Sequence, residues 1–206
     1  MDLSSFENSG FKATEIDTGI YLVEDFITEE ERSYIYDVAE SATEEDWCYG
    51  YMQGLKVQSM EKYGNEDYTL FPDIPFNEFW VDKTLTLPDE DLSDRLTKRM
   101  SAFFDPSYSL RNFSNIQRQK PGVALPEHHD RGYDDRLHYA SVTYINDNYL
   151  DGELYFPDRG LSLRPPAKSL IIFSSGEEYI HGVKPVGDGP TRYVITSFVW
   201  TEDGVV

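Results

Sequence analysis

Cysteine and long apolar runs are what this chain lacks most clearly. Its 206 residues include one cysteine, Cys48, so an internal disulfide framework is excluded and a reducing, cytoplasmic location is expected. No motif surrounds this thiol, and we interpret it as a small, partly buried hydrophobic residue. No apolar run reaches the length of a membrane span, and the first residues lack the basic and apolar regions of a signal peptide. We therefore expect neither a membrane segment nor a secretory leader.

Positive charge is also scarce. The chain has 18 lysines and arginines against 38 acidic residues, which gives a formal net charge of −20. A surface of this sign repels phosphate backbones, so a nucleic acid partner is not expected. A neutral or basic peptide, or a small molecule, is easier to accommodate. The sequence leaves the oligomeric state open.

What the chain does contain is enough hydrophobic and aromatic sequence for one well-buried domain. We therefore expect a single domain over residues 1–206, of α+β class. The first dozen residues are polar and are expected to be loosely ordered. Residues 19–23 are typical of a strand, and Thr28 with Glu31 forms a capping box that predicts a helix to about residue 40. Residues 88–104 predict a second helix, with Pro88 in its first turn and a buried stripe at Leu92, Leu96, Met100 and Phe103.

The pattern of the second half of the chain predicts short strands separated by turn residues. Residues 1–110 would supply a strand, helices and a substrate-side loop, whereas 111–206 would form the β-barrel core with a ligand cavity at its mouth. The irregular stretch 42–84 is expected to be a substrate wall or lid, in which Tyr49, Tyr51, Tyr63, Tyr68 and Trp80 either pack a substrate ring or simply anchor the loop. The predicted strands are residues 113–119, 137–145, 153–156, 169–173 and 193–200.

The most informative motif combines two of the four histidines with one aspartate. His128 and Asp130 are spaced i, i+2, so on a strand they project from the same face, and His181 lies in a second strand-like segment. Two imidazoles and one carboxylate, with the other positions open, are the ligands expected of a non-haem Fe(II) oxygenase. The alternative is chance, because a chain this acidic produces His-x-Asp spacings often.

The other two histidines receive plainer interpretations. His129 points away from the face shared by its neighbours, and we interpret it as a surface residue or an indirect support of the site. His138 has no carboxylate at a useful spacing and is interpreted as structural or exposed.

Arg192 begins an apolar strand, where a buried guanidinium is costly unless its charge is met. A carboxylate meets that charge through a two-point contact, so Arg192 is a candidate anchor for an acidic co-substrate. Thr196, four residues on and on the same face, would add a hydroxyl contact. The alternative is a salt bridge between Arg192 and one of the chain's many acids.

Residues 121–200 resemble the catalytic domain of prolyl 4-hydroxylase-type 2-oxoglutarate/Fe(II) oxygenases. The entry strand at 20–26 is similar too, and about eighty residues match closely, in an ordered set that is far more specific than any one piece of it. The resemblance implies a double-stranded β-helix, a jelly-roll or cupin-like barrel with supporting N-terminal helices. The matching segments are 121–122, 128–130, 142–147, 151–157, 169–173, 181–186 and 192–196.

The resemblance also implies roles for individual residues. His128, Asp130 and His181 would hold Fe(II), and Arg192 and Tyr144 would contact the distal carboxylate of 2-oxoglutarate. The implied reaction consumes O2 and 2-oxoglutarate, releases succinate and CO2, and hydroxylates an unactivated C–H bond, with ascorbate as an optional reductant.

Two departures from the family pattern stand out. The tyrosine that many members place shortly before the Pro-Gly is replaced by residues 118–120, an Arg-Gln-Lys sequence. The lysine anchor of collagen-type enzymes corresponds to Thr191, so the chain is closer to the arginine version.

Several functions compete within and beyond this family. Asp130 favours hydroxylation over halogenation, because halogenases leave that position to the halide. Nucleic-acid demethylases of the superfamily carry a second arginine where this chain has Phe198. A prolyl or other peptidyl hydroxylase is our first hypothesis, and a hydroxylase of free amino acids or other metabolites is the second. A non-enzymatic barrel that kept only the fold is a third, and the intact set of four site residues argues against it.

Overall fold

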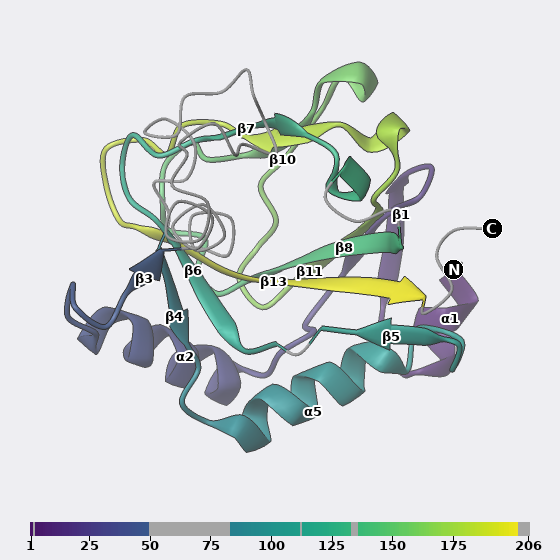
Figure 1. The fold of residues 1–206 in the computed structure, drawn as a ribbon, viewed down its shortest axis with the longest axis horizontal. Coiled ribbons are helices and arrows are strands. Elements are labelled where there is room, and N and C mark those ends of the chain that lie inside the picture. The colour runs from purple at the N-terminus through teal and green to yellow at the C-terminus, as the bar shows by residue number, and fades with distance from the viewer. Residues whose placement is uncertain (2, 50–82, 112, 133–135, 202–206) are drawn as a thin grey trace, which may run out of the picture.

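The computed structural model describes residues 1, 3–49, 83–111, 113–132 and 136–201. Two antiparallel sheets face one another across the middle of the molecule, and the helices pack on the outer side of the larger sheet (Figure 1). The larger sheet has nine strands, in the order β1 (Ala13–Asp17), β2 (Ile20–Val23), β11 (Leu170–Ser174), β8 (Leu137–Tyr144), β13 (Arg192–Thr201), β6 (Asn115–Gln119), β4 (Lys83–Thr86) and β3 (Cys48–Tyr49), with β5 (Tyr108–Leu110) paired to β13. The smaller sheet has four, in the order β10 (Leu161–Leu163), β9 (Leu154–Phe156), β12 (His181–Val183) and β7 (Leu125–His128).

Alternation along the central strands gives the larger sheet two different buried faces. On β8 and β13, Tyr144 and Val194 belong to a cluster that fills the space between the sheets. Ile195 and Val199 belong to the other cluster, which lies between the larger sheet and the helices. The barrel interior is therefore separated from the helix-side core by a single layer of backbone.

The two predicted long helices are present and cover the outer face of the larger sheet. In α2 (Glu29–Ser41) both hydrogen bonds of the predicted capping box, between Thr28 and Glu31, are formed. In α5 (Glu90–Ser101) the N-cap is Asp89, so Pro88 precedes the helix and the prediction that it lies in the first turn is wrong. The predicted stripe is buried throughout: Leu92, Leu96 and Met100 lie in α5, and Phe103 lies just beyond its C-terminal end.

The N-terminal dozen residues are more ordered than the sequence suggests. Residues Leu3–Asn8 form a short helix, α1, whose Phe6 is fully buried. The ring of Phe6 lies 4.9 Å from that of Phe103, so it closes one end of the helix-side core. Phe6, together with the partly buried Met1 and Phe11, packs this segment against the helix-side core, and the expectation of loose order is wrong.

All five predicted strands of the second half are present, as β6, β8, β9, β11 and β13. Most of the predicted substrate wall, including Tyr51, Tyr63, Tyr68 and Trp80, lies outside the described residues. None of the described helices is long and apolar enough to cross a membrane.

Candidate metal centre

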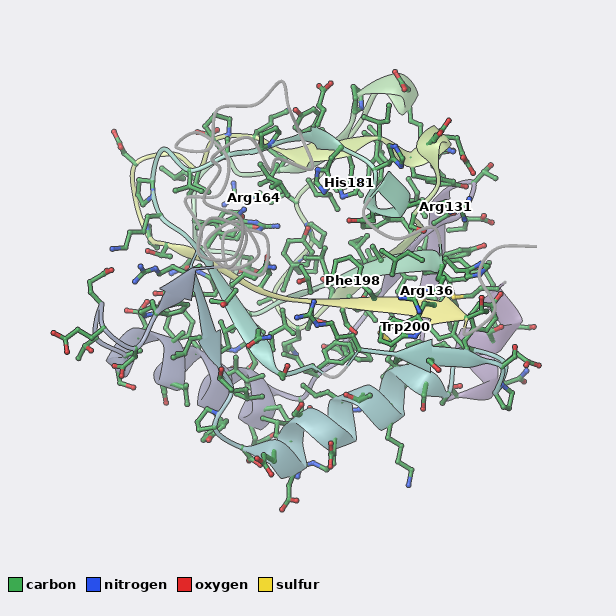
Figure 2. The ribbon with its side chains drawn as sticks, viewed as in Figure 1. Arg131, Arg136, Arg164, His181, Phe198 and Trp200 are labelled. Carbon is green, nitrogen blue, oxygen red and sulfur yellow. The ribbon has the colours of Figure 1, made fainter. Side chains whose placement is uncertain are left out.

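His128 and His181 come together because their strands pair. The last residue of β7 and the first residue of β12 are direct antiparallel partners in the smaller sheet. The two imidazole rings lie 4.4 Å apart, centre to centre, at an angle of 51°. Figure 2 shows His181 between the two sheets, with Phe198 of β13 on the opposite wall.

Each of these imidazoles is fixed in one tautomer by its own backbone. His128 Nδ1 lies 2.8 Å from the carbonyl of Pro126, and His181 Nδ1 lies 3.0 Å from the carbonyl of Tyr179. A carbonyl only accepts hydrogen bonds, so in both rings Nδ1 carries the hydrogen and Nε2 presents its lone pair. Both Nε2 atoms are thereby prepared as metal ligands.

Asp130 joins them from a different element than expected. Strand β7 ends at His128, and Asp130 begins the 3₁₀ turn η1 (Asp130–Gly132), so the shared strand face predicted from the i, i+2 spacing is wrong. The turn nevertheless directs the carboxylate to both rings: Oδ1 lies 3.7 Å from His128 Nε2, and Oδ2 lies 3.7 Å from His181 Nε2. One ligand atom from each residue lies within 4.8 Å of the others.

The charges at this site suit a cation. Burial raises the pKa of Asp130, but the neighbouring His181 and His128 outweigh it, so the pKa is lowered and the carboxylate stays ionised. Burial lowers the pKa of His181 to about 4, which keeps that imidazole neutral at pH 7. Burial also lowers the pKa of His128, but the hydrogen bond and charge of Asp130 prevail and raise it overall. A proton and a metal ion would therefore compete for His128.

An apolar shell holds the distal histidine in place. The ring of Phe173 on β11 meets that of His181 at 4.6 Å in a T-shaped contact, and the ring of Phe156 on β9 lies 5.7 Å away. Both phenylalanines are buried. Such a shell excludes water and limits the motion of the ring.

The remaining histidines lie outside this group. His129 Nδ1 is buried and has no hydrogen-bond partner in the described ranges, and His129 does not belong to the His128–Asp130–His181 group. His138 has Nε2 3.1 Å from the hydroxyl of Thr201 and makes a T-shaped contact with Tyr108, so it has a structural role.

Arg192 lies inside the same barrel and has no acidic partner among the residues described. It is 2 % exposed, yet Nη1 donates to the amide oxygen of Gln119 and Nη2 lies 3.4 Å from the Tyr144 hydroxyl, while Nε has no hydrogen-bond partner within the described segments. The guanidinium also lies over the rings of Tyr144 at 5.2 Å and Tyr149 at 5.7 Å. The alternative of an internal salt bridge at Arg192 therefore finds no support in this part of the chain.

Sequence reasoning missed Gln119 and Tyr149. Tyr149 is fully buried, and its hydroxyl has no hydrogen-bond partner within the described ranges. Gln119 could have been found from the register, because β6 and β13 place it directly opposite Arg192. Tyr149 lies in a loop, where no periodic pattern would have indicated it. Burial raises the pKa of Tyr144 to about 12, so its hydroxyl is a hydrogen-bond donor at neutral pH.

The hydroxyl of Thr196, which is predicted to contact the co-substrate, already takes part in one hydrogen bond within the protein. This hydroxyl accepts a hydrogen bond of 2.8 Å from Gln117 Nε2, across the strand pair β13 and β6. An accepting hydroxyl still has its own hydrogen to donate.

These residues fit a divalent iron ion. The buried Oδ2 of Asp130 has no hydrogen-bond partner among the residues that the structure describes, which is costly unless a ligand satisfies it. Two neutral imidazoles and one carboxylate form the three-ligand set of non-haem Fe(II) sites and leave the other coordination positions open.

Comparisons with known proteins agree with this reading. Residues 114–200 match the family model described as the 2OG-Fe(II) oxygenase superfamily. A search of curated protein sequences finds no match. The fold resembles a prolyl hydroxylase from Trichoplax adhaerens in complex with a hypoxia inducible factor peptide fragment, with a TM-score of 0.65 and 16% identity over 97% of this chain and 92% of that one.

Two further solved structures share the fold. The viral collagen prolyl hydroxylase of Paramecium bursaria Chlorella virus-1 aligns with a TM-score of 0.61 and 13% identity over 89% of this chain and 96% of its own. A prolyl-4-hydroxylase of Pseudomonas putida aligns with a TM-score of 0.59 and 18% identity over 89% and 93%. The fold is therefore the double-stranded β-helix of the prolyl hydroxylases, as predicted. The segment that matches the 2OG-Fe(II) oxygenase family model, residues 114–200, contains the His–Asp–His group and Arg192.

Proposed function

We propose that this protein uses Fe(II), O2 and 2-oxoglutarate to hydroxylate an unactivated C–H bond of a prolyl or other peptidyl residue. The observation that carries the proposal is a buried arginine, in the same barrel as the His–Asp–His group, for which the described residues provide no acidic partner. A buried charge of this kind is costly, and a ligand carboxylate would repay that cost. The proposal places the protein in the cytoplasm, in keeping with its single cysteine.

Each group has a defined task in this proposal. His128, Asp130 and His181 would hold the iron, which supplies the redox chemistry that couples 2-oxoglutarate decarboxylation to C–H hydroxylation. Arg192 and Tyr144 would bind the distal carboxylate of 2-oxoglutarate, and Thr196 would donate its remaining hydroxyl hydrogen. The fixed Nδ1–H groups of both histidines orient their rings before any ligand arrives.

The preference for a peptide rests on two observations. The chain covers nearly the whole of a fold neighbour whose structure contains a peptide fragment. Its net charge of −20 also favours neutral or basic partners over phosphate-bearing ones. Neither observation names the sequence around the target residue.

The first test is spectroscopic. Addition of Fe(II) and 2-oxoglutarate without oxygen should produce a visible charge-transfer band, and His181→Ala should abolish it, whereas His138→Ala should keep it. A missing band in the wild-type protein, or a band unaffected by His181→Ala, would contradict the proposal.

The second test concerns the substrate. The protein is incubated with iron, 2-oxoglutarate and ascorbate together with a peptide panel or a metabolite panel, and mass spectrometry measures a gain of one oxygen. Oxygen gain only in proline-containing peptides supports a prolyl substrate. Gain only in free metabolites would replace the peptide hypothesis with the small-molecule one.

A further inference from the structure

Arg192 is positioned by a neutral side chain in a protein that is rich in acids. Gln119 is 2 % exposed and stands directly opposite Arg192 in the pairing of β6 with β13. Its amide oxygen accepts a hydrogen bond from Nη1 of Arg192. One arm of the guanidinium is thus fixed by a partner that carries no charge.

Two other largely buried arginines are paired with glutamates. Arg118, the residue before Gln119, lies 2.9 Å from Glu44, and Arg99 lies 2.8 Å from Glu31. The chain has 38 acidic residues with which to neutralise a buried guanidinium. At Arg192 it instead places glutamine, which has the shape of glutamate and lacks its charge.

The difference of one charge has a direct consequence for binding. A glutamate at this position would hold the same arm of Arg192 but would cancel the positive charge that attracts a ligand carboxylate. The other neighbours of Arg192 are also neutral, namely the Tyr144 hydroxyl and the faces of Tyr144 and Tyr149. The Nε–H of Arg192, which has no partner among the described residues, remains able to donate a hydrogen bond to a ligand.

We infer that Gln119 is a positioning residue that orients Arg192 while preserving its charge, and so sets the preference for a co-substrate with a distal carboxylate. This inference rests on the proposed function, because it assumes that a 2-oxo acid binds in the barrel. It assigns a role to one of the positions, residues 118–120, at which the chain departs from its family.

The test compares two probes of equal length on anaerobic, Fe(II)-loaded protein. One is 2-oxoglutarate, and the other is 2-oxopentanoate, which has a methyl group in place of the distal carboxylate. Titration of the charge-transfer band gives a dissociation constant for each. We expect the wild-type protein to prefer 2-oxoglutarate by on the order of 100-fold, as for a charged, two-point hydrogen bond.

Gln119→Glu should lower that preference by about tenfold or more, through weaker binding of 2-oxoglutarate alone. Binding of 2-oxopentanoate should stay within about twofold of wild type, since its methyl group makes no charged contact. The melting temperature should be at or above that of wild type, because the substitution pairs a buried charge. A residue with only a structural role would not move affinity and stability in opposite directions.

Two further variants complete the design. Gln119→Met keeps the charge of Arg192 but removes its fixed arm, so 2-oxoglutarate should bind about threefold to tenfold more weakly. Asn115→Asp is the matched control, because it adds the same charge to the same strand roughly 13 Å away. Its preference should equal that of wild type.

The outcomes distinguish a failure of the proposed co-substrate from a failure of the role proposed for Gln119. If wild-type protein binds both probes equally, the co-substrate assignment itself fails. If the wild-type protein discriminates and Gln119→Glu discriminates equally well, or weakens both probes alike, the role of Gln119 is wrong. Should Gln119→Glu not fold, unchanged 2-oxoglutarate binding in Gln119→Met overturns the inference on its own.

Discussion

The larger sheet has one face against the helices and one toward the smaller sheet, and the two faces satisfy their charged groups differently. On the helix side, Arg99 forms a bidentate contact with Glu31, and one of its arms also reaches a backbone carbonyl. On the barrel side, the part of the chain that the structure describes gives Arg192 only neutral partners and gives one oxygen of the buried Asp130 no hydrogen-bond partner. Among the described residues, the charges on the helix side are therefore paired, whereas those on the barrel side are not.

This difference indicates a division of labour. The helix-side cluster joins aromatic and aliphatic residues from α1, α2, α5 and the sheet, so it supplies most of the burial that stabilises the fold. The barrel-side cluster is smaller and shares its space with polar groups. A buried charge without an oppositely charged partner lowers the stability of the fold, and such a charge is tolerated where a bound ligand neutralises it.

The largest expected effect comes from removing one phenylalanine on each face. Phe26 is fully buried against Phe103 and Phe113 on the helix side, and Phe156 is fully buried beside His181. Each change to alanine should lower the free energy of unfolding by about 3 to 5 kcal/mol, measured by denaturant titration. Only Phe156→Ala should also weaken Fe(II) binding, by about tenfold, because it loosens the distal ligand.

Metal affinity is measured anaerobically at a temperature where both variants are folded. The Phe26→Ala protein serves as the control for general destabilisation. Equal weakening of metal binding by the two variants would show that the faces are not independent.

The next effect concerns the unmet charge itself. Arg192→Leu should weaken 2-oxoglutarate binding by on the order of 100-fold, or about 3 kcal/mol, while Fe(II) binding survives. The free energy of unfolding should not fall, because the substitution removes a buried charge that has no acidic partner. Calorimetry and thermal melting measure the two quantities. Equal loss of iron and 2-oxoglutarate binding would contradict the assigned role.

The smallest effect is a pH dependence on the helix side. Burial raises the pKa of Glu31, but its hydrogen bonds with Arg99 and Thr28 outweigh burial and lower the pKa from 4.5. A lowered folded-state pKa adds stability that is present above pH 4.5 and is lost as the pH falls through the folded value. Glu31→Gln should therefore cost about 1 to 3 kcal/mol at pH 7, and less below pH 4.5. A difference that stays constant with pH would refute this account.

The sequence was most informative where a periodic pattern coincided with a local rule. The capping box at Thr28, the stripe of α5 and the five strands after residue 113 depend on nearest neighbours and alternation, and all are present. The histidine and aspartate at 128 and 130 were paired correctly but for an incorrect reason. Strand β7 ends at His128, and the alternation of residues along a strand does not indicate where that strand ends.

What the sequence could not supply was long-range. The environment of Arg192 depends on the register between β6 and β13, and the partner of Thr196 depends on the same register. Such pairings join residues more than seventy positions apart in sequence. Tyr149 was missed because it lies in a loop, and its ring contacts, with Arg164 and Arg192, are both to residues distant in sequence.

The direct pairing of His128 with His181 also affects how the smaller sheet assembles. These partners close a loop of about 53 residues, and closing such a loop has an entropic cost that the few contacts of two short strands must offset. An ion bound by both imidazoles would hold the two ends of that loop together. Because an ion that binds only the folded form adds stability that grows with the logarithm of its concentration above Kd, iron loading and closure of the smaller sheet would be a single linked equilibrium.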